Sequence, residues 1–356
     1  MLKGVFVGFI CVFSVELWST EIIDPDIREV LVFGTKADKI KLTGSGTQID
    51  SEELEKQDYS DLNQVISSAP GVYVREEDGF GLRPNIGIRG ATSDRSQKIT
   101  LMEDGVLITP APYSAPAAYY ITNASRLHAV EVLKGPSAIQ AGPHTVGGAV
   151  NLVTRPVPTQ DLTEVELTTG TDSFHKIAGS LGRVNDNFGF ILNALSYGSD
   201  GFKQLDGGGS TGFVRNDVNF KARWELETKP KQSITVKLGF AGEDADETYL
   251  GLTNSDSHRS PARRYPASKL DRFESQHRQV HFNHSIEFNS EVSVDTKIYF
   301  NKFHRSWNKF SGFIDGPSAQ NVLRNPESYV SAYETLTGSR DSRVGYFTDL
   351  SIDVTD

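Results

Sequence analysis

Two-residue alternation of apolar and polar side chains dominates the second half of the chain. Apolar side chains occupy every second position from Val218 to Leu226, and charged or amide side chains lie between them. Successive side chains of a β-strand point to opposite faces, so this pattern predicts a strand with one apolar and one polar face. The alternation recurs around residues 234–240, 280–288 and 292–300.

The connections between these strands alternate in length. Short turns are expected at residues 185–187, 228–232 and 289–291, and long connections at 198–216, 241–276 and 304–346. Short turns at one end and long loops at the other are typical of outer-membrane β-barrels, whereas a soluble sandwich has no reason to show this difference. The pattern therefore favours a barrel over a sandwich. The mature sequence offers no run of 18 apolar residues for a helical span.

The number of strands limits what residues 159–356 can form. About eight antiparallel strands are expected there, and a barrel of eight is filled by its own side chains. Such a barrel cannot enclose the preceding domain, whereas a plugged barrel has about 22 strands. We therefore expect residues 159–356 to be a partial, truncated β-barrel and the chain to be a fragment of a longer protein.

The N-terminus has the features of an exported protein. Residues 1–20 are predicted to be a signal peptide, with Lys3 as its positive region and Val5 to Val15 as its apolar core. A buried core helix is the alternative. The single cysteine, Cys11, lies in this segment, so the mature chain would hold no thiol. The formal net charge of −10 disfavours nucleic acid as a partner.

Residues 46–158 are expected to form an α+β domain. Asp50 and Glu53 fit a capping box, and a helical apolar pattern from Leu62 ends at Pro70-Gly71. Asp104-Gly105 is a strong hairpin signal. Arg155-Pro156-Val157-Pro158 marks the end of the domain. Short strands are predicted at residues 72–75, 85–89, 98–102, 106–108, 129–133 and 149–154.

Several short motifs follow one another in this domain. They are Leu62-Asn63-Gln64-Val65, Ala69-Pro70-Gly71-Val72, Ile86-Gly87-Ile88-Arg89-Gly90, Met102-Glu103-Asp104-Gly105-Val106, the stretch from Val130 to Ser137 and that from Gly147 to Thr154. In this order and spacing they resemble the plug domain of TonB-dependent receptors. The resemblance implies a monomeric protein in the lipid of the outer membrane of a Gram-negative bacterium, where it would import a scarce nutrient with energy from the TonB protein.

A segment before the plug resembles the family's TonB box. Residues 21–45 are expected to be periplasmic, and residues 27–34 contain the box-like stretch. An unburied strand-like segment suits capture by the edge of a partner's sheet. The alternative is the first strand of the plug. The resemblance assigns the coupling role to Glu29, Val30, Leu31 and Val32.

Two arginines are candidates for contacts between the plug and the barrel. Arg89 and Arg155 could pair with carboxylates of the barrel wall. A solvated surface arginine is the equal alternative for each, because exposed ion pairs contribute little.

Among its subfamilies the chain most resembles ferric dicitrate receptors. The resemblance is carried by Thr109 to Tyr113, Val146 to Pro158, Gly251-Leu252-Thr253 and Arg263-Arg264-Tyr265. It implies a ferric chelate as transported ligand, no resident cofactor, and Arg305 as a ligand contact. Two implied contacts depart from the subfamily pattern, since Ala115 replaces a glutamine and Phe80 a threonine. These departures leave the chelate itself open.

A basic segment supports an anionic ligand. Residues 257–280 carry six basic and two acidic side chains in an acidic protein. Arg263 and Arg264 in this segment are expected to clamp an anionic chelate, because arginine forks fit carboxylates. A solvated loop, or a contact with lipopolysaccharide phosphates, is the alternative.

A metal site and an enzyme are not expected. His277 and His281 would share one face of a strand but lie roughly 13 Å apart, and His284 would face the other way. No nucleophile with a base and an orienting group stands out. The sequence thus predicts active import of a ferric chelate. The alternatives are a passive binding or adhesion barrel and import of cobalamin or haem.

Overall fold

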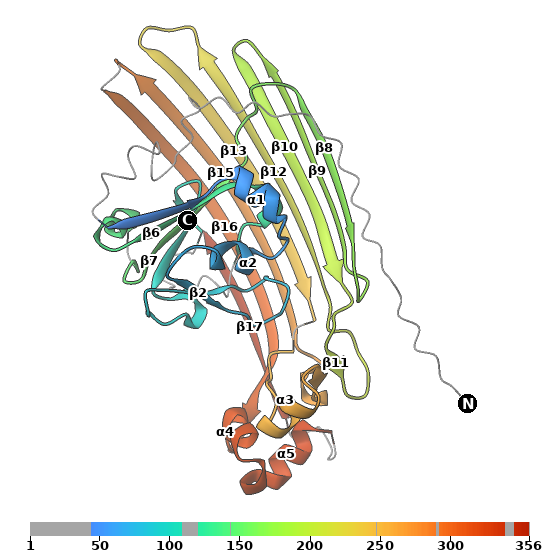
Figure 1. The fold of residues 1–356 in the computed structure, drawn as a ribbon. Helices are drawn as coiled ribbons and strands as arrows, with labels where there is room; N and C mark the ends of the chain where they lie inside the picture. Colours follow the sequence, from blue (N-terminus) through green and yellow to red (C-terminus); the bar gives the residue numbers. More distant parts are fainter. Residues whose placement is uncertain are drawn as a thin grey trace.

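The computed structural model describes residues 44–108, 120–142, 144–246, 248–289, 292–338 and 345–355, the last of these by backbone alone. The predicted signal peptide, the TonB-box-like residues 27–34 with Glu29, Val30, Leu31 and Val32, and Ala115 lie outside the described residues. A small mixed domain lies against the concave side of a large curved sheet (Figure 1).

The N-terminal domain, residues 44–154, is built around a five-stranded sheet of order β1-β6-β7-β4-β5. β4 and β7 run parallel, and the other neighbours are antiparallel. The strands are β1 (Ser45–Ile49), β4 (Ile99–Glu103), β5 (Val106–Leu107), β6 (Leu127–Lys134) and β7 (Gly148–Thr154). The remaining elements are α1 (Ser51–Gln57), α2 (Leu62–Ser67), the hairpin of β2 (Val72–Arg75) with β3 (Asn85–Ile88), and the 3-10 turns η2 (Asp94–Ser96), η4 (Ala124–Arg126) and η5 (Pro136–Ala141).

Local signals of the sequence explain these elements. Asp50 caps α1 by accepting a hydrogen bond from the Glu53 backbone at 3.1 Å, as predicted. Asp104 and Gly105 have φ angles of 49° and 75°, which a two-residue hairpin turn between β4 and β5 requires. The predicted α+β class is therefore confirmed. β1, which the sequence analysis did not predict, adds an edge strand to the sheet.

The wall sheet contains eight antiparallel strands, each paired with its neighbour in the chain, and β8 and β17 form its edges. The expected number of strands is thus correct. The strands are β8 (Leu162–Thr169), β9 (His175–Asn185), β10 (Phe188–Ser199), β12 (Phe213–Leu226), β13 (Lys231–Ala245), β15 (Arg272–Glu287), β16 (Ser293–Phe313) and β17 (Gly345–Thr355).

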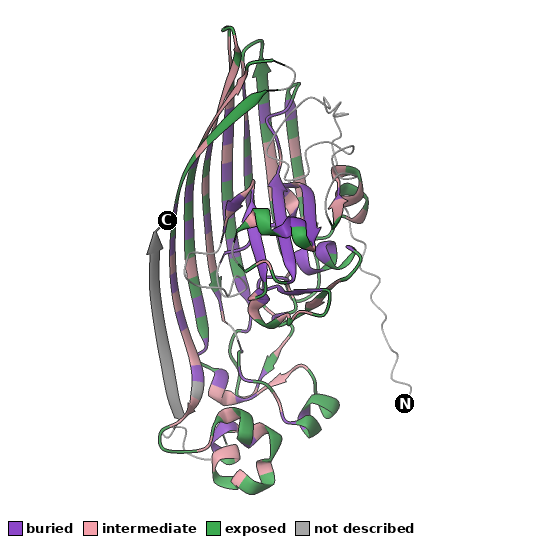
Figure 2. Ribbon diagram, turned by 90° about the vertical axis from the view of Figure 1, so that its left-hand side faces the viewer, coloured by how far each residue is buried: buried purple, intermediate pink, exposed green. Residues whose placement is uncertain are grey.

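Exposed and buried residues alternate along these strands, so the wall is banded when coloured by burial (Figure 2). On β15, Val280 and Phe282 are exposed on the convex face, whereas His277, Gln279 and His281 are buried on the side of the N-terminal domain. The wall therefore places apolar side chains outward and polar side chains inward.

Several wall strands are longer than predicted. β15 begins at Arg272 and β16 continues to Phe313, so Arg272 and Arg278 lie on a strand and not in a loop. Toward the long connections the outward side chains of β15 and β16 become polar, so the apolar outward pattern no longer marks these strands although the backbone pairing continues.

Two long connections fold together at one end of the wall. They contain α3 (Asn254–Arg259), β14 (Arg263–Arg264), η6 (Pro266–Ser268), α4 (Ala319–Arg324), η7 (Pro326–Tyr329) and α5 (Val330–Leu336). We call these segments, residues 248–271 and 314–338, the loop cap. Its apolar core joins both connections through Leu250, Tyr265, Val322 and Leu336. β14 also pairs with β11 (Gln204–Leu205) of a third connection. In the described part of the chain, no helix is long and apolar enough to cross a membrane.

Candidate functional site: the interface between the N-terminal domain and the wall

The end of β4 carries a buried carboxylate that faces the wall. Glu103 has no exposed side-chain surface and accepts hydrogen bonds from Gln279 at 2.8 Å and from Lys237 at 2.5 Å. Within its own domain it also accepts from Tyr120 and Thr122 and pairs with Arg126 at 2.8 Å. A buried charge is tolerated only when it is paired and hydrogen-bonded, and Glu103 meets both conditions.

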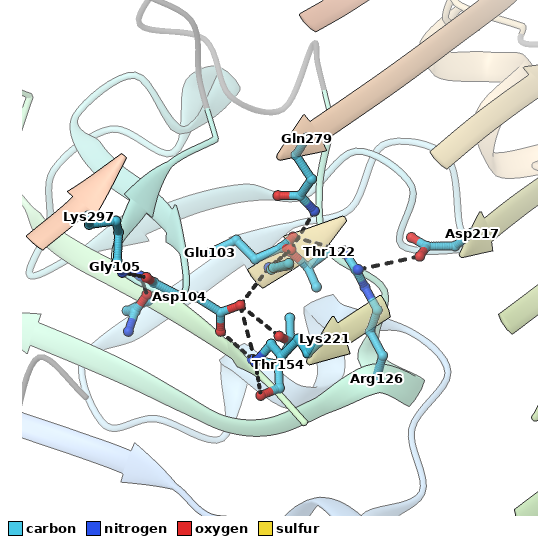
Figure 3. A network of polar contacts seen from close by, with 12 residues as sticks. Glu103, Asp104, Gly105, Thr122, Arg126, Thr154, Asp217, Lys221, Gln279 and Lys297 are labelled. Atoms are coloured by element: carbon cyan, nitrogen blue, oxygen red, sulfur yellow. Dashed lines mark hydrogen bonds and ion pairs between the residues drawn. The ribbon is translucent and has the colours of Figure 1, made fainter. Parts of the chain in front are cut away.

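Asp104, at the hairpin tip, is held by both sides of the interface (Figure 3). Thr154 of β7 donates its backbone N–H at 2.8 Å and its hydroxyl at 2.7 Å. Three wall lysines converge on the same residue: Lys237 lies at 2.5 Å and Lys221 at 3.5 Å from the carboxylate, and Lys297 donates to the backbone carbonyl at 2.5 Å. The tip is therefore fastened to β12, β13 and β16.

The cations determine the protonation of these carboxyl groups. Burial alone would raise the pKa of Glu103, but Arg126 and Lys237 outweigh it and hold that pKa well below its usual range. Burial opposes ionisation of Asp104 too, and Lys221 and Lys237 lower its pKa in spite of it. Both groups are thus carboxylates at neutral pH. Arg126 extends the network to Asp217 of the wall at 3.4 Å.

A second ion pair fastens the loop between β2 and β3. Arg83 is almost fully buried, and its guanidinium lies 2.5 Å from Glu243 of β13 and 3.8 Å from the centre of the Phe273 ring. Asp78 shapes this loop by accepting backbone hydrogen bonds from Phe80, Leu82 and Arg83. The two clusters hold the domain to the wall at separate points.

Of the two predicted interface arginines, one reaches the wall. Arg155 donates hydrogen bonds to Glu164 of β8 and Ser180 of β9. Arg89 instead donates a hydrogen bond to Ser45 of β1 at 2.9 Å, and this contact lies within the N-terminal domain. Its side chain is directed toward the edge strand that the sequence analysis did not predict.

A group of cations and aromatic rings lies where the N-terminal domain meets the loop cap. The Arg305 guanidinium lies 5.5 Å from the Trp307 ring centre, the Lys309 ammonium 4.0 Å and the Arg95 guanidinium 5.1 Å. Tyr249 accepts a hydrogen bond from Arg95 at 2.9 Å, and its ring centre lies 3.7 Å from the Lys309 ammonium. We call these five residues the cationic cluster. Arg95 also forms an ion pair with Glu77 at 4.0 Å.

The backbone positions Arg95 for this contact. Its φ of 48° is unusual for a residue with a side chain, and Asn85 accepts its backbone N–H at 2.8 Å. Arg305 and Trp307 are buried on the inner face of β16, whereas Tyr249 is 41% exposed, so the cluster reaches solvent on the loop-cap side.

The two arginines of the predicted basic clamp have partners within the protein, and their predicted role in ligand binding stays a prediction. Arg263 pairs with Asp206 at 2.7 Å and with Asp256 at 3.2 Å, and Arg264 donates to Thr248 at 3.2 Å. The hydrogen bond to Asp206 raises the pKa of Arg263 further. Arg272 is paired with Asp244 at 2.5 Å. All three acids, Asp206, Asp244 and Asp256, lie outside residues 257–280, over which the charges were counted.

The remaining predicted residues are placed as follows. Phe80 packs against Phe202 and Phe213 with ring centres 5.5 and 4.8 Å away. His277 stacks on Tyr120 at 4.0 Å, and His284 turns outward and contacts Gln232 at 2.9 Å. No group of three metal-ligating side chains is found among the described residues.

The wall network was not predicted from the sequence. Lys221 and Lys237 appeared only as members of polar strand faces, and Glu103 only as part of a motif. The available signal was a carboxylate at the end of the apolar stretch from Ile99 to Met102, since a charge there requires a partner.

Comparison with known proteins gives consistent matches. Residues 38–149 match the family model described as the TonB-dependent Receptor Plug Domain. The vitamin B12 transporter BtuB of Photobacterium profundum is 25% identical over 281 residues, which are 75% of this chain and 44% of that protein. BtuB of Vibrio vulnificus (strain CMCP6) is 26% identical over 220 residues, or 61% of this chain and 34% of that protein.

Solved structures share the fold. The unliganded ferric citrate transporter FecA matches with a TM-score of 0.66 at 22% identity, over 79% of this chain and 43% of that one. The siderophore receptor PiuA from Acinetobacter baumannii matches with a TM-score of 0.60 at 15% identity, over 76% of this chain and 38% of that one. The chain thus spans less than half the length of each of these proteins, which are named as receptors or transporters. Residues 38–149 thus match the plug domain of TonB-dependent receptors, and the chain shares the fold of solved outer-membrane receptors and transporters of that kind.

Proposed function

We propose that this receptor actively imports an anionic ferric chelate across the outer membrane, with energy supplied by TonB. The observation that carries the proposal is the cationic cluster of Arg95, Tyr249, Arg305, Trp307 and Lys309. It combines one cation of the plug with two of the wall beneath the loop cap. An anion bound there would contact both parts of the receptor at once.

The chemistry of the cluster fits a carboxylate-rich or otherwise anionic chelate. Two guanidinium groups supply planar forks of donors, and the aromatic rings keep the cations in place. Three positive groups lie around the Trp307 ring, and they come from both the plug and the wall. An anionic ligand could form ion pairs with them, whereas an uncharged ligand could not.

Coupling to TonB is part of the same proposal. The box-like residues 27–34 would be offered to TonB, and ligand contact with Arg95 would be transmitted to the plug. Transport also requires the plug to release part of the wall network around Glu103 and Asp104. We infer no enzymatic step and no resident cofactor.

Import of cobalamin is the second candidate, because the curated relatives with 25% and 26% identity are vitamin B12 transporters. Cyanocobalamin carries no net charge, so it would not use a cationic cluster. A passive binding or adhesion barrel is the third candidate, and it predicts uptake that is indifferent to the proton gradient.

Equilibrium binding to the full-length receptor separates these ligands. We expect ferric citrate to bind more tightly than a neutral ferric hydroxamate or cyanocobalamin. Arg305→Gln should weaken ferric citrate binding by about tenfold, the loss of roughly one charge-assisted hydrogen bond, and leave cyanocobalamin unaffected. Lys231→Gln, an exposed cation at the end of β13 away from the loop cap, is the matched control. Preferential binding of cyanocobalamin, unaffected by Arg305→Gln, would reject the anionic chelate.

Deletion of residues 27–34 tests the coupling. In full-length receptor the deletion should leave ligand affinity unchanged and abolish uptake by cells. Unchanged uptake would refute the coupling role of this segment, and uptake that persists without a proton gradient would favour the passive barrel.

A further inference from the structure

The outer face of the wall changes from apolar to polar at a defined position on three neighbouring strands. Following β13, β15 and β16 toward the loop cap, the outward side chains are mainly apolar and then become polar. The last exposed apolar residues are Phe240 on β13, Val280 on β15 and Phe300 on β16, whereas on β12 the polar Asn216 lies between the exposed Val218 and Val214. Exposed apolar side chains on this face are expected for a surface that faces lipid.

Two of the four strands continue with a cation immediately above this boundary. The next outward residue is Arg278 on β15 and Lys302 on β16, whereas β12 has Asn216 and β13 has Gly242. Arg278 and Lys302 are both exposed and lie directly opposite each other in the register of the two strands. Directly opposed residues of adjacent strands have Cβ atoms about 5 Å apart.

Like charges in directly opposed positions destabilise a sheet unless a counter-ion is present. Among the described side chains, none of the outward neighbours of Arg278 on β13, β15 and β16 is acidic: they are Phe240, Gly242, Gln276, Val280, Phe300 and His304. The hydrogen bond recorded for the Arg278 side chain goes to Gln276 at 3.4 Å. On β17, Thr355 lies opposite Lys302, and Asp353 lies opposite His304, two residues further along the strand. Asp353 is therefore not directly opposite either cation of the pair.

The position of the pair indicates which anion it meets. Long connections of outer-membrane barrels are extracellular, so the loop cap marks the outer side of the membrane. A cation directly above the apolar belt then lies at the level where the outer leaflet changes from acyl chains to headgroups. The anions concentrated at that level are lipid phosphates.

We propose that Arg278 and Lys302 form a binding site for a phosphate group of an outer-leaflet lipid. The Arg278 guanidinium binds two phosphate oxygens, the Lys302 ammonium binds from the adjacent strand, and an acyl chain lies along Val280 and Phe300. The site faces outward, away from the cationic cluster on the inner face of β16. It is therefore independent of the imported ligand and of the proposed function.

Lipid retention by the purified full-length receptor tests this site. Receptor is reconstituted in phosphatidylcholine vesicles that contain either lipid A or dephosphorylated lipid A, extracted into mild detergent, and analysed for retained lipid by mass spectrometry. The test variant is Arg278→Gln combined with Lys302→Gln. The control is Arg183→Gln, an exposed arginine near the opposite end of β9.

We expect wild type and Arg183→Gln to retain lipid A, and the double variant to lose at least four-fifths of it. Dephosphorylated lipid A should not be retained by any of them. Equal retention of lipid A by wild type and the double variant, or of both lipids by wild type, would overturn the proposal. Competition by inorganic phosphate at millimolar concentration distinguishes the source: complete displacement of lipid A would assign the site to free phosphate and overturn the lipid assignment. Thermal unfolding of the double variant confirms that it is folded before lipid is measured.

Discussion

The ammonium group of Lys237 on β13 lies 2.5 Å from a carboxylate oxygen of Glu103 on β4 and also 2.5 Å from one of Asp104. A single wall side chain therefore holds both acidic residues at the tip of the plug hairpin. Because this contact is buried, the position of the plug depends on ion pairs that dissolved salt screens much less than it screens exposed pairs.

Removal of Lys237 should loosen the plug. Lys237→Met leaves two buried carboxylates with fewer cations, and breaking a buried pair in this way costs about 3–5 kcal/mol. We expect faster hydrogen exchange of the β4 and β5 amides in the full-length receptor. Lys297→Met is the control, because Lys297 donates to a backbone carbonyl of Asp104 and its loss should cost about 1 kcal/mol. Equal effects of the two substitutions would contradict this account.

The wall network should also weaken in acid. Arg126 and Lys237 hold the pKa of Glu103 below its usual range despite burial, and Lys221 and Lys237 do so for Asp104. Lowered carboxyl pKa values stabilise the folded state fully above the unfolded pKa of about 4, and this contribution is lost as the pH falls through the folded pKa. Thermal unfolding should therefore show little change in this contribution from pH 8 to pH 5 and a decline below about pH 4. Glu103→Gln should reduce that decline. An unaltered pH profile of stability in this variant would refute the stabilising role of ionised Glu103.

Arg83 should not be replaceable by lysine. Its guanidinium pairs with Glu243 and stacks on Phe273, and an ammonium group cannot make both contacts. We expect Arg83→Met to lower the free energy of unfolding by about 3 kcal/mol and Arg83→Lys to recover less than half of the loss. The matched control is Arg75→Met, since the pair of Arg75 with Asp94 is exposed and its loss should cost under about 1 kcal/mol. Full rescue by lysine would show that charge alone matters.

Asp256 should hold the loop cap together. It accepts hydrogen bonds from Tyr265 at 2.6 Å and from Tyr333 at 3.0 Å, which belong to different connections. These hydrogen bonds lower the pKa of Asp256, with that from Tyr265 contributing most. Asp256→Leu should make residues 314–338 accessible to trypsin at concentrations that leave wild type intact, while the wall still resists heat and detergent. Asp315→Leu, at an exposed turn of the same connection, is the control.

The sequence predicted those features that local pattern determines. The alternation from Val218 to Leu226 specified a strand and its two faces, and Asp104-Gly105 specified the hairpin, because each depends on residues close in the chain. The plug class and the eight wall strands followed from such signals.

The candidate site depends on residues far apart in the chain, and that part was missed or misread. Glu103 meets Lys237 across 134 positions, and no local rule relates the two. The acidic partners of the basic segment were missed for the same reason: Asp206 and Asp244, which pair with Arg263 and Arg272, lie in other connections or strands. Arg305 was placed by resemblance, but its neighbours Trp307, Lys309 and Arg95 became visible only in the fold.

The division of charge across the plug interface has a consequence for passage through the barrel. The hairpin contributes the carboxylates of Glu103 and Asp104, and the wall contributes the ammonium groups of Lys221, Lys237 and Lys297. Withdrawal of the hairpin from the wall would remove both carboxylates from the three ammonium groups. The inner face of the wall would then present a row of cations, which would attract an anion.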